Sequence, residues 1–131
     1  MRKDHSMNIN DLYQLFLSAW SADTAKGEWT PECPSLNHCA VTAVIVQDYF
    51  GGDLLRCLCD DGNSHYYNSC PDGEYDLTYS QFAYSNVVPF KDKSEVRTRD
   101  YVLSFPDTKI RYEILKERIE NAWKEQFSSE D

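Results

Sequence analysis

The sequence has 131 residues, 14% of them aromatic, which fits one folded domain over residues 1–131 and argues against intrinsic disorder. Its formal net charge of −9, without a stripe of Lys and Arg, argues against nucleic acid or an anionic membrane as a partner. The five cysteines cannot all pair, and no apolar run is long enough for a signal peptide or a membrane span, so we expect reduced thiols in a cytoplasmic protein.

An amphipathic helix is predicted near the N-terminus. Residues 1–8 are polar and are expected to form a flexible tail. The helix should cover about 9–22, with Asn8 or Asn10 as its N-cap, because its apolar residues recur every three or four positions. These residues are Leu12, Leu15, Phe16, Ala19 and Trp20. Residues 23–38 contain glycine and proline without periodicity and are expected to form a long loop, which is often a functional feature.

The segment from Cys39 to Phe50 is predicted to be a buried helix. It is apolar on nearly every side, and the pair Gly51-Gly52 is a favourable C-terminal stop. Its β-branched residues also allow a strand, but the run is long for a strand and its alanines favour a helix.

The middle of the chain has the pattern of an antiparallel meander. Three β-like runs are separated by turn signals that contain Asp-Gly: 53–60, 64–70 and 74–78. A helical turn near 80–82 and a loop over 86–100 follow, and a long helix over about 105–127 ends the chain. The predicted apolar face of that helix consists of Ile110, Ile114, Leu115, Ile119, Ala122 and Trp123. The predicted fold is α+β, with an antiparallel sheet of at least three strands packed on the buried helix.

Cys39, His65 and Asp76 form the candidate catalytic group. Cys39 begins the buried helix, where the positive end of the helix dipole favours the thiolate, the reactive form of a nucleophilic cysteine. A strand packed across the helix start would bring His65 within reach as a base, and pairing of the second and third strands would bring Asp76 near His65 to orient its ring. The alternative reading is structural: a small buried Cys39, a His65 bonded to a neighbour and an Asp76 that caps a turn.

Other polar and aromatic residues are weaker candidates. Asn68 is a substitute for the orienting role, and Trp29 and Tyr67 are candidates for lining a substrate cleft, although such aromatics also occur in cores. A zinc site is the competing use of the thiols and imidazoles. Its candidate ligands would be Cys33, His38, Cys39, Cys57, Cys59, His65 and Cys70. The sequence has no Cys-x₂-Cys pair, whereas zinc modules normally have two close pairs, so no cofactor is predicted.

Four segments together resemble the YunG-like family of uncharacterised bacterial proteins: NHCAVTAVIVQDYFGGDLLRC, SHYYN, DGEYDLTYSQF and RYEILKERI. The resemblance covers roughly residues 12–123 and rests on the combination, since each segment alone is weakly specific. The family has no established activity, so this resemblance implies no particular reaction.

The order of a helix-borne cysteine, a strand-borne histidine and a strand-borne polar residue is similar to that of papain-like folds, including NlpC-type peptidases and transglutaminase-like proteins. This resemblance implies a cysteine hydrolase or acyltransferase that acts on a peptide or small amide, with Cys39 as nucleophile, His65 as base and Asp76 as the orienting residue. Such enzymes often place a glutamine before the cysteine as an oxyanion donor; here His38 precedes it, so His38 or the Cys39 backbone N–H would take that role. The alternatives are a non-catalytic binding domain on the same frame and, least favoured, a zinc-stabilised module.

Overall fold

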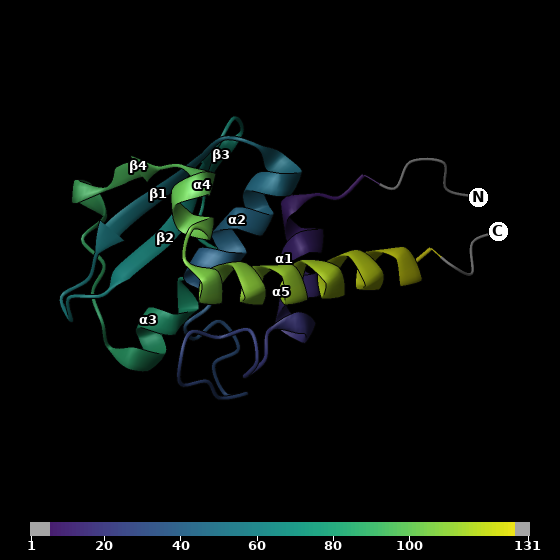
Figure 1. Ribbon diagram of the computed structural model, residues 1–131, viewed down its shortest axis with the longest axis horizontal. Helices are drawn as coiled ribbons and strands as arrows, with labels where there is room; N and C mark the ends of the chain where they lie inside the picture. Colours follow the sequence, from purple (N-terminus) through teal and green to yellow (C-terminus); the bar gives the residue numbers. More distant parts are fainter. Residues whose placement is uncertain (1–5, 128–131) are drawn as a thin grey trace.

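The computed structural model describes residues 6–127 (Figure 1). Residues 1–5 and 128–131 lie outside the described residues, and so does most of the expected tail over 1–8. Within the described part, Met7 packs against the core and Asn8 caps the first helix. No helix among the described residues is both long and apolar enough to span a bilayer.

The described elements alternate between helices and short strands. The helices are α1 (Ile9–Ala19), α2 (Cys39–Phe50), α3 (Ser80–Ser85), α4 (Arg99–Leu103) and α5 (Pro106–Glu125), with a 3-10 turn, η1, at Lys91–Lys93. The strands are β1 (Asp53–Leu58), β2 (Ser64–Cys70), β3 (Gly73–Tyr75) and β4 (Glu95–Arg97). They form one antiparallel sheet in the order β3-β2-β1-β4. The predicted α+β class and antiparallel meander are confirmed, with a fourth strand added beside β1.

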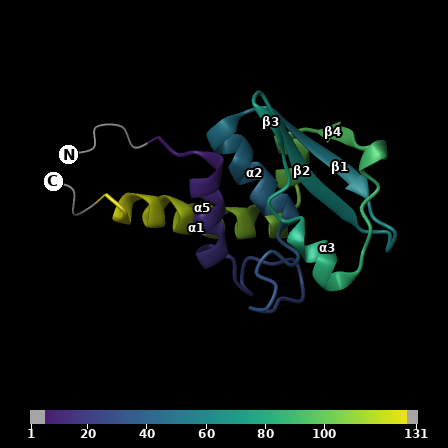
Figure 2. The ribbon, with the colours of Figure 1, turned by 180° about the vertical axis from the view of Figure 1, so that it is seen from behind.

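Helix α2 is the buried centre of the fold. Every side chain from Val41 to Val46 is buried, because α2 packs against β2 and α5 and shares a core cluster with α1. Figure 2 shows α1 and α5 crossing on the side of α2 away from the sheet. A helix that is apolar all round needs partners on all sides, and this layered arrangement supplies them. The predicted buried helix is therefore confirmed, with the bounds expected from the sequence.

Two glycines join α2 to β1. Gly51 and Gly52 both have positive φ angles, 74° and 81°, a conformation that glycine adopts without steric cost. A Cβ atom on Gly52 would lie 2.2 Å from the backbone oxygen of Ser69, whereas one on Gly51 would meet nothing within 4 Å. The close approach at Gly52 allows the sheet to lie directly across α2.

Two expectations about the C-terminal half are wrong. The segment 86–100 is not a plain loop: it contains η1, β4 and the start of α4, and β4 is held by backbone pairing with β1 and not by an apolar pattern. Ile110 does not belong to the apolar face of α5, since its side chain is 57% exposed. The buried face follows Thr108, Arg111, Leu115 and Ile119. It is rotated by one residue because Arg111 turns inward to bond the carbonyl of Thr24 in the loop before α2.

Candidate active site

Cys39 is the first residue of α2 and lines a cavity of about 650 Å³. Its side chain is half-buried, and its sulfur lies 3.9 Å from the carbonyl oxygen of Ser64 at the start of β2. The N-cap residue, His38, makes no side-chain hydrogen bond to the first turn of α2. The N–H groups of this turn, which carry the positive end of the helix dipole, are thus left uncapped beside the thiol.

His65 and Asp76 form a buried hydrogen-bonded pair. The β2–β3 hairpin pairs Asn68 with Tyr75, which places Asp76 just beyond β3 and within reach of His65. Nε2 of His65 lies 2.7 Å from Oδ2 of Asp76, and the two side chains are only 1% and 8% exposed. Burial lowers the pKa of His65, but its hydrogen bond to Asp76 and its interaction with the Cys39 thiol outweigh burial and raise the pKa to about 9. The ring is therefore protonated at neutral pH.

The thiol of Cys39 is coupled to the same ring. Burial raises the pKa of Cys39, but its interaction with His65 outweighs burial and brings the pKa below the ordinary value of 9.0. Nδ1 of His65 is buried and has no hydrogen-bond partner among the described residues. Cys39 and His65 line the same cavity, and no hydrogen bond joins the sulfur to the ring; catalytic hydrogen bonds of this kind often close only when a substrate binds. The lowered thiol pKa and the raised imidazole pKa together favour a thiolate–imidazolium pair.

Three further residues hold this pair in place, and the sequence did not predict the role of any of them. Nζ of Lys91 lies 2.7 Å from the same Oδ2 of Asp76, and together with His65 it outweighs burial and lowers the pKa of the carboxyl. The ring of Phe82 meets His65 edge-on with centroids 4.6 Å apart, and Tyr67 stacks parallel to it at 5.8 Å. Lys91 lies in the segment expected to be a loop and carries no sequence signal. Phe82 lies in the DLTYSQF segment, which contributes to the family resemblance but does not itself indicate a contact with His65.

The ring of His38 does not line the cavity beside Cys39. Its ring is buried, with Nε2 2.7 Å from Oγ1 of Thr24 and Nδ1 2.9 Å from the carbonyl oxygen of Leu36. Burial lowers the pKa of His38 to about 4, so the ring is neutral. Both nitrogens are engaged within the loop that precedes α2, which leaves the ring without a donor for an oxyanion. Its role in this structure is to hold the loop at the start of α2.

Asn68, Trp29 and Tyr67 are also placed away from the cavity. Nδ2 of Asn68 donates to the carbonyl of Ala43 at 2.9 Å, which ties β2 to α2. Nε1 of Trp29 donates to the carbonyl of Pro34 at 2.9 Å, within its own loop. Neither of these side chains, nor Tyr67, lines the cavity beside Cys39. The aromatic residues that do line it are Tyr66, Phe82, Tyr101 and Phe105.

The other cysteines differ from Cys39 in their surroundings. All five are free thiols, and Cys39 alone among them is not fully buried. Burial raises the pKa of Cys57 and that of Cys59, the latter to about 12, so both stay protonated at neutral pH. Within residues 6–127, no group of three or more His, Cys, Asp or Glu side chains is placed to hold a metal ion.

Comparison with known proteins gives a family but no reaction. Residues 8–124 match the family described as YunG protein. The chain is 42% identical over 68 residues to "Uncharacterized protein YunG" of Bacillus subtilis (strain 168). That match covers 52% of this chain and 57% of the relative, so the aligned part spans little more than half of either protein. No solved structure matches the chain.

Proposed function

We propose that this chain, which belongs to the YunG family, is a cysteine hydrolase or acyltransferase that acts on an amide through a thioester on Cys39. The observation that carries the proposal is the buried Asp76–His65 pair at a cavity that both His65 and Cys39 line. We call these three residues the triad. Their order along the chain and the elements that carry them are similar to a papain-like arrangement, which adds support by analogy. A non-catalytic binding domain would be favoured by a buried thiol with no cavity beside it, and Cys39 is not placed in that way.

The first half-reaction forms the thioester. The thiolate of Cys39 attacks the carbonyl carbon of the amide, and the negative charge moves to the carbonyl oxygen. The uncapped N–H groups at the start of α2 can donate hydrogen bonds to that oxygen. The imidazolium of His65 gives a proton to the amine nitrogen as the C–N bond breaks, so the amine leaves in its neutral form.

The second half-reaction releases the acyl group. Neutral His65 takes a proton from water in a hydrolase, or from an acceptor amine in an acyltransferase. The resulting nucleophile attacks the thioester carbon, and the C–S bond breaks to restore the thiolate beside the imidazolium. Asp76 keeps the proton on Nε2 and holds Nδ1 toward the thiol throughout the cycle.

The pH dependence of Cys39 alkylation tests the proposal. Iodoacetamide reacts with the thiolate, so the rate of labelling, followed by mass spectrometry of the Cys39 peptide, reports the thiol pKa. The acid limb of the wild-type profile should have its midpoint below that of N-acetylcysteine amide, an unperturbed thiol measured in the same way. In His65→Ala the midpoint should move to this reference value or above it, because burial then acts without the imidazole. A wild-type midpoint at or above the reference value refutes the proposal.

Cys59 is the internal control for this experiment. It lines the same cavity, but its pKa is about 12, so it should stay unlabelled below about pH 9 in the folded protein. Covalent catalysis is checked separately with 4-nitrophenyl acetate as the acyl donor. A mass increase of one acetyl group that hydroxylamine removes should appear in the wild type and be absent from Cys39→Ala. An adduct that forms equally in both proteins contradicts a thioester on Cys39.

A further inference from the structure

The cavity beside Cys39 contains cationic side chains without carboxylate partners among the described residues. Apart from Cys39 and His65, its charged lining residues are Lys26, Arg56, Asp61, Asp107 and Arg111. Nε of Arg111 lies 2.8 Å from Oδ2 of Asp107, so these two charges neutralise each other. Asp61 accepts hydrogen bonds from the backbone and side-chain amides of Asn63 and shapes a turn. Lys26 and Arg56 make no ion pair with any residue in the range 6–127.

Arg56 is connected to the thiol through one residue. Nε of Arg56 donates to Oγ of Ser64 at 2.9 Å, and the carbonyl oxygen of Ser64 lies 3.9 Å from the sulfur of Cys39. In the strand register Arg56 lies opposite Tyr66 of β2 and Glu95 of β4, and the carboxylate of Glu95 is bonded to Arg97 and not to Arg56. With Nε committed to Ser64, the two terminal nitrogens Nη1 and Nη2 are left to bind a ligand. A planar pair of N–H donors matches the geometry of a carboxylate or a phosphate, and of these two anions a carboxylate is the one that commonly neighbours the carbonyl of a small amide.

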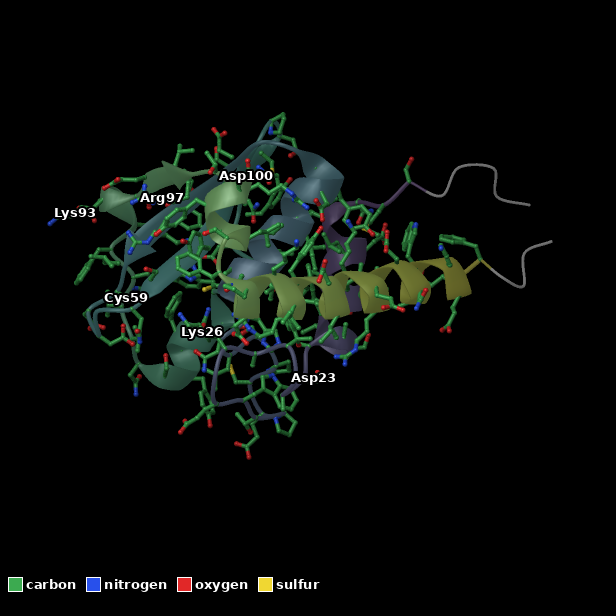
Figure 3. The ribbon with its side chains drawn as sticks, viewed as in Figure 1. Asp23, Lys26, Cys59, Lys93, Arg97 and Asp100 are labelled. Atoms are coloured by element: carbon green, nitrogen blue, oxygen red, sulfur yellow. The ribbon has the colours of Figure 1, made fainter. Side chains whose placement is uncertain are left out.

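The charge of the cavity contrasts with that of the whole protein. The chain carries a formal net charge of −9, so most of its surface repels anions. Unpaired cations in the cavity next to the nucleophile therefore favour an anionic ligand at this position. In Figure 3, the labelled Lys26 belongs to the loop before α2, while Arg56 belongs to β1, so the two cations come from separate elements.

We propose that Arg56 makes the site specific for small amides that carry a carboxylate close to the carbonyl that Cys39 attacks. The inference rests on the proposed function and names its substrate class. The guanidinium pairs with the carboxylate and directs the neighbouring carbonyl carbon toward the sulfur. A cavity of about 650 Å³ has the size of a small-molecule site. The exposed rings of Tyr101 and Phe105, which also line it, offer apolar surface to the rest of the ligand.

Two alkylating agents of the same size test this specificity. Iodoacetate places a carboxylate beside the carbon that the thiolate attacks, and iodoacetamide places a neutral amide there; each forms a C–S bond and releases iodide. The readout is the ratio of the two rate constants at Cys39, divided by the same ratio for N-acetylcysteine amide. We expect this normalised ratio to be about tenfold or more in the wild type. It should fall about threefold or more in Arg56→Gln, where His65 and Lys26 remain as cations in the cavity.

Lys93→Gln is the matched control. It removes the same charge from an exposed side chain of η1 that does not line the cavity. Its ratio should equal that of the wild type. Arg56→Lys keeps the charge without the planar fork, and its ratio should lie between the wild type and Arg56→Gln. If circular dichroism shows that Arg56→Gln is unfolded, the role of Arg56 is judged from Arg56→Lys alone. A normalised ratio in Arg56→Lys equal to that of the wild type then overturns the role.

The outcomes separate this inference from the proposed function. A wild-type ratio near one, or an equal drop in Lys93→Gln and Arg56→Gln, overturns the role of Arg56. The ratio can be measured at any pH at which Cys39 is alkylated. A thiol with an ordinary acid limb but an Arg56-dependent ratio would therefore refute the cysteine enzyme while supporting the carboxylate site.

Discussion

Replacing Asp76 with asparagine tests the triad at its carboxylate. The substitution keeps the shape of the side chain but removes the charge that lies 2.7 Å from Nε2 of His65. In the wild type, burial lowers the pKa of His65, and the hydrogen bond to Asp76 is the strongest of the interactions that overcome burial and raise the pKa to about 9. We therefore expect His65 to lose its proton at a lower pH in Asp76→Asn.

The size of this change follows from the burial of the pair. A hydrogen bond to a charged group contributes about 1.5–3 kcal/mol, and one pKa unit corresponds to about 1.36 kcal/mol. Solvent replaces little of the lost interaction, because the two side chains are 1% and 8% exposed. The pKa of His65 should fall by about one to two units. The population of the thiolate–imidazolium pair, relative to the neutral pair, should fall about ten- to a hundredfold.

Proton NMR of the histidine rings measures this pKa directly. The chain has only three histidines, so their signals can be followed individually between about pH 5 and pH 11. His38 serves as an internal reference, since its pKa of about 4 keeps it neutral over this range. The absorbance of the thiolate near 240 nm, recorded in parallel, should decrease at neutral pH in Asp76→Asn.

Asp48→Asn is the control for removing a well-bonded carboxylate elsewhere. Asp48 lies in α2 and pairs with Arg99 and Lys116 outside the triad. This variant should leave the His65 titration unchanged. The reasoning is refuted if Asp76→Asn moves the His65 midpoint by less than about 0.3 pKa units, or if Asp48→Asn moves it as far.

Three further outcomes are expected. Gly52→Ala should lower the free energy of unfolding by about 1–3 kcal/mol more than Gly51→Ala, since both have positive φ but only Gly52 contacts the β2 backbone; equal losses in urea unfolding, followed by circular dichroism, would contradict this. Asn68→Ala should cost about 1–3 kcal/mol in the same assay without shifting the His65 titration, because its amide bonds to α2; a shifted titration would assign it to the triad. The pKa of Asp76 is lowered in the folded protein, so its stabilisation is present above the unfolded value of 3.8 and is lost as the pH falls through the lower folded value. The stability difference between the wild type and Asp76→Asn should thus be smaller at about pH 3 than at about pH 5, and an unchanged difference would oppose this assignment.

The candidate site divides into predictable and unpredictable parts. The place of Cys39 at the start of α2 followed from an apolar run and a glycine stop, both local signals. The approach of Asp76 to His65 followed from the pairing of neighbouring strands across a short turn. The engagement of His38 by Thr24 depends on how a loop of irregular structure closes on itself, and no periodicity encodes it. Lys91 reaches Asp76 from a segment that carries no pattern at all.

The same division holds for the fold. The sequence by itself determined the α+β class, the buried helix α2 and the antiparallel meander, because periodicity, capping and turn chemistry act over only a few residues. The tertiary structure alone decided that β4 pairs with β1, that Arg111 and not Ile110 faces inward, and that Arg56 and Cys39 share one cavity. Those outcomes depend on segments that are far apart in the chain and meet in space. The local sequence pattern does not distinguish the competing side chains, so the tertiary contacts decide which of them is buried.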